Sequence, residues 1–342
     1  MFKNNNLFIT SNDFAEFANV VYSNREKYGK QNFNKDKEVI EISNNPDFEY
    51  IIYKKLSFEL KDNDVIFCHT NQINNLFYHL KRVKKIKNIT LITHQTDKLI
   101  SKKDFNKKPE CIEKWFSVNV GYNHPNLVPI PIGIASDFSL KNLNSSDFPK
   151  FKENNFHKKD INLYINFRVN TNFKERKDIH NRFKNEPWVI SNSPDLDKIT
   201  YLNNLSRASF VLCPWGNGVD THRFWEALYA GSIPVTKKHP TYKPSEGLPA
   251  LFVNDYKEIN YDLLESFMSN LDLNDYNFEK LTKEYWHKEI KKEYIHKNNE
   301  IIYEKKYETL FFKLIRSVKK IYNSKIKKFT TYANKINKKL RF

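Results

Sequence analysis

The chain has 342 residues, of which 39% are hydrophobic and 15% aromatic, and its formal net charge is +17. At roughly 100–200 residues per domain this length predicts two domains, and the apolar content excludes an intrinsically disordered chain. There is no run of about 18 apolar residues to predict a transmembrane helix, and the first residues lack the basic start and apolar core of a signal peptide.

The basic residues are concentrated near the C-terminal end. Residues 303–342 contain thirteen Lys or Arg and two Glu, so this segment carries about +11 and the rest of the chain about +6. Basic charge can serve nucleic acid, acidic membranes or phosphate-bearing ligands. Because the charge is mainly a property of the tail and no recognised nucleic-acid module is present, we expect no nucleic-acid partner.

The three cysteines, Cys68, Cys111 and Cys213, are few, odd in number and far apart. This spacing argues against a disulfide framework and against a cysteine-based zinc site, and it favours a reducing, cytoplasmic location. The basic tail adds the alternative of a peripheral position on the inner membrane face.

Residues 1–145 alternate short apolar runs with a helical stretch at 74–86. The predicted strands in this part are 65–70, 89–95, 116–121 and 126–135. Such a βαβ pattern predicts a parallel sheet covered by helices. We interpret residues 1–145 as an N-terminal domain of this type.

A polar stretch follows, in which we place the linker at 146–158, and the same pattern resumes in 159–275. The predicted strands are 161–167, 187–191, 209–214, 232–236 and 250–254, and helices are expected near 174–185, 196–207, 221–230 and 257–270. Crossover helices are expected at 276–302. The predicted fold class is therefore α/β, with two Rossmann-like domains facing each other across a cleft and ligands at the carboxyl ends of the strands.

The seven glycines of the chain are few enough to be informative. Gly216 and Gly218 directly follow the predicted strand 209–214 and precede a predicted helix that begins near Thr221. Glycine allows close approach of a ligand to the backbone, and the first turn of a helix, with Asp220 or Thr221 as its N-cap, offers N–H groups to a diphosphate. The alternative is a plain βα turn that uses glycine for packing.

Arg223 and Glu226 are three residues apart and share one face of this helix. Arginine suits bidentate contact with phosphate oxygens, and glutamate suits a pair of ribose hydroxyls. The alternative is a weak intrahelical salt bridge. Lys237 and Lys238 follow the next strand and could reach the same phosphates.

The segment SFVLCPWGNGVDTHRFWEALYAGSIPV, residues 209–235, resembles the donor-site signature of exostosin-like glycosyltransferases. The matching positions are Phe210, Leu212, Cys213, Pro214, Gly216, Gly218, Asp220, Arg223, Glu226, Ala227, Leu228, Ala230, Gly231, Ile233, Pro234 and Val235. The match covers under a tenth of the chain, and looser similarity extends through 119–135 and 164–176.

This resemblance implies the GT-B architecture, with residues 1–145 as the acceptor-side domain and a nucleotide-sugar as co-substrate held by the C-terminal domain. It also implies no tightly bound cofactor and no catalytic metal. One departure is Trp215, where the family often has arginine, and Arg168 or Arg176 could supply that charge. The candidate donor-binding residues are Arg168, Gly216, Asn217, Gly218, Asp220, Thr221, His222, Arg223, Glu226 and Lys237.

An inverting sugar transfer needs a base that deprotonates the acceptor hydroxyl, and a retaining one does not. The strand at 89–95 contains His94 near its end and is followed by Asp97, and the strand at 65–70 contains His69 near its end. These side chains are expected at the cleft, so Asp97 or His94 is the preferred base, with His69 next. Capping of the following helices is the equally weighted alternative.

The apolar positions of the tail, among them Leu314, Val318 and Ile321, recur at spacings of three and four, which defines one face of a helix. The opposite face is rich in lysine. Residues 310–342 could therefore lie on an anionic membrane surface or pack on the N-terminal domain.

Taken together, the sequence predicts a glycosyltransferase that acts on a glycan or lipid-linked acceptor in surface polysaccharide synthesis. The alternatives are a nucleic-acid-binding basic protein, suggested by the charge of +17 and the many aromatic residues, and a non-catalytic GT-B-like scaffold.

Overall fold

The computed structural model describes residues 8–22, 26–29, 39–44, 49–53, 57–135, 142–148, 150–291 and 297–303, and shorter pieces up to residue 326. Of the predicted tail, residues 327–342 lie outside the described residues. The chain divides into two compact units. The larger unit comprises Met1–Lys55 and Leu60–Glu300, and the smaller one Leu56–Glu59 and Ile301–Phe342.

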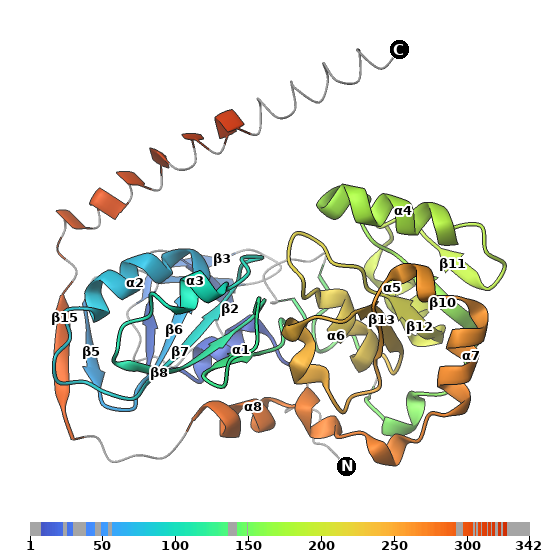
Figure 1. Cartoon of the computed structure of the whole chain (residues 1–342), viewed down its shortest axis with the longest axis horizontal. Coiled ribbons are helices and arrows are strands. Elements are labelled where there is room, and N and C mark those ends of the chain that lie inside the picture. The colour runs from blue at the N-terminus through green and yellow to red at the C-terminus, as the bar shows by residue number, and fades with distance from the viewer. Residues whose placement is uncertain are drawn as a thin grey trace. The chain divides into compact units, whose positions relative to one another are not determined.

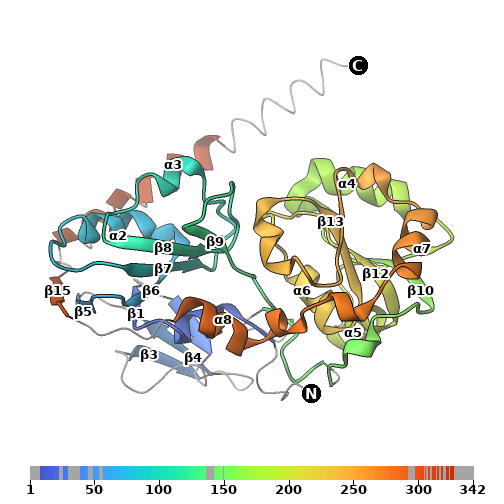
Figure 2. The same cartoon turned by 60° about the horizontal axis from the view of Figure 1, so that its bottom comes forward.

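The first sheet of the larger unit has five parallel strands in the order β1-β6-β7-β8-β9 (Figure 1, and Figure 2 for β1 and β9). They are β1 (Val20–Tyr22), β6 (Val65–His69), β7 (Ile89–His94), β8 (Ile112–Ser117) and β9 (Leu127–Pro129). The helices of this part are α1 (Ser11–Glu16), α2 (Ile73–Leu80) and α3 (Lys102–Phe105). Nearly every residue of β6 and β7 is buried, which explains why both appear in the sequence as continuous apolar runs.

Several boundaries of this part differ from the sequence prediction, and strand β9 ends at Pro129 rather than at residue 135. Helix α2 ends at Leu80 rather than at residue 86, because the basic residues that follow form a turn. Strand β8 begins at Ile112 rather than at residue 116. Its polar residues Glu113 and Lys114 interrupt the apolar run on which the prediction relied.

The second sheet also has five parallel strands, in the order β11-β10-β12-β13-β14. They are β10 (Ile161–Ile165), β11 (Val189–Ser191), β12 (Ala208–Leu212), β13 (Ile233–Lys237) and β14 (Leu251–Val253). The helices are α4 (Phe173–Phe183), α5 (Lys198–Arg207), α6 (His222–Tyr229) and α7 (Tyr261–Ser269). The chain starts at β10, goes to the edge strand β11, and returns to β12 on the other side of β10. The direction of winding therefore reverses between β10 and β12.

The segment predicted as a linker contributes to the core of the second sheet. Phe148, Phe151 and Phe156 are buried in the same hydrophobic cluster as the strands of that sheet. Residues 146–158 are thus held by packing in their described part, which a polar sequence did not indicate.

Helix α8 (Lys283–Ile290), seen also in Figure 2, returns the chain to the first sheet. Trp286 and Ile290 are buried in a cluster that contains Phe14 and residues of β6 and β7. The hydroxyl of Tyr229 in α6 accepts a hydrogen bond from the Ile9 amide at 3.0 Å and donates one to the Leu281 carbonyl at 2.9 Å. Segments at the two ends of the larger unit therefore meet at one buried side chain.

The remaining elements were not anticipated from the sequence. An antiparallel sheet has the order β2-β4-β3, and a two-stranded sheet pairs β5 with β15. These strands are β2 (Glu26–Gly29), β3 (Val39–Asn44), β4 (Glu49–Tyr53), β5 (Ser57–Lys61) and β15 (Asn299–Tyr303). The 3₁₀ turns are Thr70–Gln72, Glu153–Asn155, Val169–Asn172, Pro240–Ser245, Tyr256–Glu258, Leu273–Asp275 and Phe278–Leu281. Within the described ranges, no helix is both long and apolar enough to cross a bilayer.

Candidate functional site

The loop from Cys213 to Asp220 leaves β12 at the point where the winding of the second sheet reverses. In open α/β sheets this reversal opens a crevice at the carboxyl ends of the strands, and ligands bind there. The loop is internally braced, because the Gly216 amide donates to the Gly218 carbonyl at 2.9 Å. The Tyr242 hydroxyl donates to the Val219 carbonyl at 2.7 Å.

Both glycines of the loop lie against protein side chains. A Cβ added to Gly216 would lie 3.1 Å from Nη2 of Arg176. A Cβ added to Gly218 would lie 3.0 Å from Nδ2 of Asn119 and 3.1 Å from Oδ1 of Asp97. Close packing therefore accounts for both glycines, and it places Asp97 directly beside the loop.

All three nitrogens of the Arg176 guanidinium donate hydrogen bonds, either to the loop or to the segment 168–171. Nε and Nη2 donate to the carbonyls of Trp215 and Pro214 at 2.8 and 2.7 Å, and Nη1 donates to the carbonyl of Arg168 at 2.9 Å and to the Thr171 hydroxyl at 2.6 Å. Burial lowers the pKa of Arg176 to about 10, so the side chain stays charged at neutral pH. The guanidinium of Arg176 is thus bonded to the protein itself and is not available to bind a ligand.

Lys237, the last residue of β13, places its cation over the Trp215 ring. Its ammonium lies 4.4 Å from the centre of the Trp215 ring and 5.2 Å from that of Tyr256, and it pairs with the carboxylate of Glu175. Arg168, in contrast, is exposed, with its guanidinium 3.6 Å from the Asp195 carboxylate. Asn217 is exposed at the tip of the loop.

The buried carboxylate of Asp220 connects the loop to the segment that follows β9 of the first sheet. It accepts hydrogen bonds from the amides of Ile132 at 2.8 Å and Thr221 at 2.9 Å, and from Nε1 of Trp225 at 3.0 Å. The Asp220 amide donates to Oδ1 of Asn119 at 2.8 Å. Burial raises the pKa of Asp220 to about 7. The amides of Asp220 and Thr221 are thus used within the protein.

The first turn of α6 presents the polar groups that remain. Thr221 is the N-cap residue, as one of the two sequence alternatives had it, but its side chain makes no capping bond. His222 Nδ1 lies 2.8 Å from the Gly133 carbonyl. Oγ1 of Thr221 and Nε of Arg223 are buried and lack a hydrogen-bond partner in the part of the chain that the structure describes.

Arg223 and Glu226 do not form the intrahelical salt bridge that was the alternative interpretation of their spacing. Oε2 of Glu226 instead accepts a hydrogen bond from the Tyr201 hydroxyl at 2.7 Å, and no ion pair of Arg223 occurs among the described residues. Nε1 of Trp215 is a further buried polar atom for which the described residues supply no partner. Because buried polar atoms are nearly always hydrogen-bonded, the two such atoms in the first turn of α6, on Thr221 and Arg223, indicate a place that a polar ligand completes.

His94 and His69 differ from Asp97 in their surroundings. His94 is 1% exposed, Nδ1 accepts from the Gln95 amide at 2.7 Å, and Nε2 lies 3.2 Å from the Pro131 carbonyl. Burial lowers the pKa of His94 to about 3, so the ring is neutral and both nitrogens are used. His69 is half-buried and accepts from the Asn71 amide at 3.3 Å. Asp97 alone of the three is exposed.

Backbone strain marks the same edge of the first sheet. Gln95 and Asn119, which follow β7 and β8, have φ angles of 68° and 58°. A non-glycine residue in this region costs roughly 1 kcal/mol or more, and such residues collect at functional sites. The sequence prediction missed Asn119 because it placed this residue inside a strand at 116–121, whereas β8 ends at Ser117.

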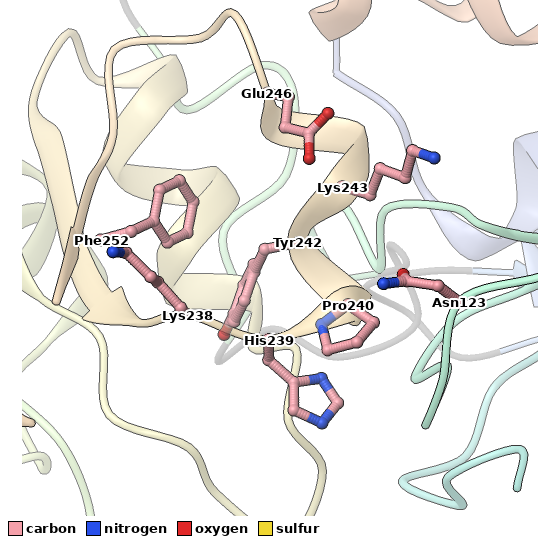
Figure 3. Close-up of a pocket in the computed structure, with 8 residues that line it drawn as sticks. All are labelled: Asn123, Lys238, His239, Pro240, Tyr242, Lys243, Glu246 and Phe252. Atoms are coloured by element: carbon pink, nitrogen blue, oxygen red, sulfur yellow. The ribbon is translucent and has the colours of Figure 1, made fainter. Parts of the chain in front are cut away.

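A cavity of about 650 Å³ adjoins the loop (Figure 3). Its lining residues are Asn123, Lys238, His239, Pro240, Tyr242, Lys243, Glu246 and Phe252. The His239 ring packs edge-on against Trp215 at 5.0 Å between ring centres. Apart from Lys238, no sequence signal singled out these residues. A second cavity of about 590 Å³ lies beside α4 and includes Glu175, Arg182 and Lys237.

Within the described ranges, no three His, Cys, Asp or Glu side chains are grouped so that they could hold a metal ion.

Comparison with known families and with curated proteins gave no match. Among solved structures, the chain is similar to an α-glucosyltransferase in complex with UDP and a 13-mer DNA, at 12% identity over 65% of this chain and 74% of that one, with a TM-score of 0.29. It is also similar to an α1,3-fucosyltransferase with GDP-fucose, at 11% identity over 68% and 80% of the two chains and a TM-score of 0.30. A third is AviGT4, a glycosyltransferase involved in avilamycin A biosynthesis, at 11% identity over 66% and 78% and a TM-score of 0.30. The likeness is low in both sequence and structure.

The lowered pKa of His94 predicts a specific loss of stability in acid. Because the folded protein binds the proton far less readily than the unfolded chain, whose histidine pKa is near 6.5, this contribution is complete above pH 6.5 and decreases as the pH falls toward 3. Between pH 7.5 and pH 5 the wild type should lose about 2 kcal/mol relative to His94→Gln, measured by urea unfolding.

The control is Ile199→Asn, at an exposed residue that does not titrate, whose difference from wild type should stay constant between the two pH values. A constant difference for His94→Gln as well would contradict the buried, neutral state of this ring.

Proposed function

We propose that this protein is a glycosyltransferase of GT-B type that moves a sugar from a nucleotide-sugar donor to a glycan or lipid-linked acceptor, in surface polysaccharide synthesis. One observation carries the proposal. The segment that resembles the exostosin-like donor signature folds as strand, loop, helix and strand at the reversal of the second sheet, and it leaves Arg223 without an internal ion pair among the described residues.

The diphosphate of the donor would lie at the first turn of α6. Arg223 supplies the charge, and the Thr221 hydroxyl, which is buried without a partner, supplies a further donor. The His222 and Arg223 amides belong to the first turn, where helical amides have no partner within the helix. Because the Asp220 carboxylate already occupies the Thr221 amide, the guanidinium rather than the helix end is the main attraction for the diphosphate.

The ribose of the donor would lie against Glu226. Its Oε2 is held by the Tyr201 hydroxyl, which orients the carboxylate and leaves Oε1 to accept from a ribose hydroxyl. Arg168, exposed at the end of β10, can approach the same nucleotide from the other side of the crevice.

Asp97 is the base that we propose for an inverting transfer. It is exposed and lies beside Gly218 at the loop. The carboxylate would take the proton of an acceptor hydroxyl while the oxygen attacks the anomeric carbon. The bond from that carbon to the diphosphate breaks, and the diphosphate leaves with the electron pair, stabilised by Arg223. We propose no metal for this step, so EDTA should leave the rate unchanged.

The acceptor would enter through the cavity beside the loop. Its aromatic side chains, Tyr242 and Phe252, offer apolar faces, and Asn123 and the lysines offer hydrogen bonds (Figure 3). A volume near 650 Å³ falls in the usual range for small-ligand sites.

Asn123→Ala should raise the acceptor KM several-fold and leave the Kd of the donor unchanged. An unchanged KM would remove the cavity from the acceptor path.

The donor site is tested by calorimetric binding of UDP, GDP, CMP and dTDP sugars. Arg223→Ala removes one charge-assisted hydrogen bond, worth about 1.5–3 kcal/mol, so the Kd of the cognate donor should rise roughly ten- to a hundredfold. Arg182→Ala is the matched control, because Arg182 is exposed and lines the second cavity.

Loss of binding in the Arg182 variant but not in the Arg223 variant would move the donor to the second cavity. Salt-sensitive DNA binding without binding of any nucleotide-sugar would instead favour a nucleic-acid-binding protein. Tight donor binding without any transfer would favour a scaffold.

Asp97→Asn keeps the shape of the side chain beside Gly218 and removes the base. We expect kcat to fall about 10²- to 10⁴-fold with the donor Kd unchanged. Asp262→Asn, at an exposed position on α7, is the control and should retain full activity. If Asp97→Asn is equally active, then Asp97 is not the base, and a retaining transfer, which needs none, becomes the better account.

A further inference from the structure

Exposed apolar side chains are concentrated in the smaller unit of the structure. Of the seventeen large apolar residues that are exposed in the described parts of the chain, eleven lie between Ile301 and Ile326. They include Leu310, Leu314 and Tyr322, each about 64% or 63% exposed. Soluble proteins rarely leave such a contiguous set uncovered unless it serves an interaction.

These side chains form one stripe along a helix. Every described residue between 307 and 326 is helical, as the short helical pieces near the C-terminal end of Figure 1 show. At 3.6 residues per turn, the exposed apolar residues from 310 to 322 fall within an arc of about 140°. They are Leu310, Phe311, Leu314, Ile315, Val318, Ile321 and Tyr322. The stripe is therefore a continuous surface rather than a set of isolated residues.

The charge of the same segment indicates which kind of partner it binds. Residues 310–342 contain eleven Lys or Arg and no Asp or Glu. A helix with an apolar stripe and an excess of basic residues binds in the plane of a bilayer, where the stripe enters the region between headgroups and acyl chains and the cations meet anionic lipids. A protein partner would need an apolar groove with a strongly acidic rim.

We infer that the described helical residues between 307 and 326 dock the protein on an anionic lipid surface. The apolar stripe supplies the contact with the acyl chains, and the lysines and arginines supply the selectivity for negatively charged headgroups. The inference is independent of the sugar-transfer reaction and holds whether or not the proposed function does.

Sedimentation of the full-length protein with lipid vesicles tests the inference. Vesicles of phosphatidylcholine and phosphatidylglycerol should retain the wild type, vesicles of phosphatidylcholine alone should retain at least tenfold less, and about 0.5 M salt should release it, because it screens the attraction. Leu314→Asn with Val318→Asn should weaken binding to the anionic vesicles at least tenfold. The matched control is Ile190→Asn with Ile199→Asn, two exposed apolar residues outside the tail, which should bind as wild type.

A second pair of variants keeps the stripe and changes the charge. Lys319→Gln with Lys320→Gln should weaken binding to anionic vesicles several-fold, whereas Lys102→Gln with Lys103→Gln, an adjacent exposed pair on α3, should not. Thermal unfolding of each variant serves as the check that it is folded.

Three results would overturn the inference. The first is a wild type that does not sediment with anionic vesicles, and the second is a set of tail variants that sediment as the wild type does. The third is a stripe that supports a concentration-dependent oligomer or DNA binding while vesicles are not bound.

Discussion

The buried carboxylate of Asp220 is the interaction on which the candidate site depends. It accepts hydrogen bonds from the loop after β9, through Ile132, and from the first turn and the indole of α6, through Thr221 and Trp225. Without it, the buried indole N–H of Trp225 would be left unsatisfied, at about 1–3 kcal/mol, and the half-buried amides of Ile132 and Thr221 would lose their partner. These bonds set the position of α6, and with it Arg223, relative to the edge of the first sheet that carries Asp97 and Asn119.

The same carboxylate changes the electrostatics of the site. An isolated helix start attracts anions through its dipole and its unpaired amides. Here the protein places its own acid at that position, so a diphosphate bound as we propose would be attracted mainly by Arg223. The glycines have a related role. Gly216 and Gly218 make room for Arg176 and Asp97, so the loop is held in place before a ligand arrives.

The sequence predicted the elements around the motif closely, because β12 and β13 are continuous apolar runs and α6 follows a loop with two glycines. It could not predict the strand order, and the reversal between β10 and β12 is what places this loop where ligands bind in open α/β sheets. Long-range contacts were also hidden. Arg176 bonds to carbonyls 38 and 39 residues away, and His94 is buried against Phe14 and Pro131. A local sequence pattern does not show these contacts, so Arg176 was considered for ligand binding and His94 as a catalytic base.

The central claim is that the first turn of α6 holds the diphosphate of a nucleotide-sugar. A crystal structure of the protein with the nucleoside diphosphate that binds most tightly tests it directly. The account predicts phosphate oxygens within hydrogen-bond distance of the Arg223 guanidinium and the Thr221 hydroxyl, with the ribose at Glu226. Phosphates bound beside Lys237 and Arg182 in the second cavity, with Arg223 still unpaired, would contradict it.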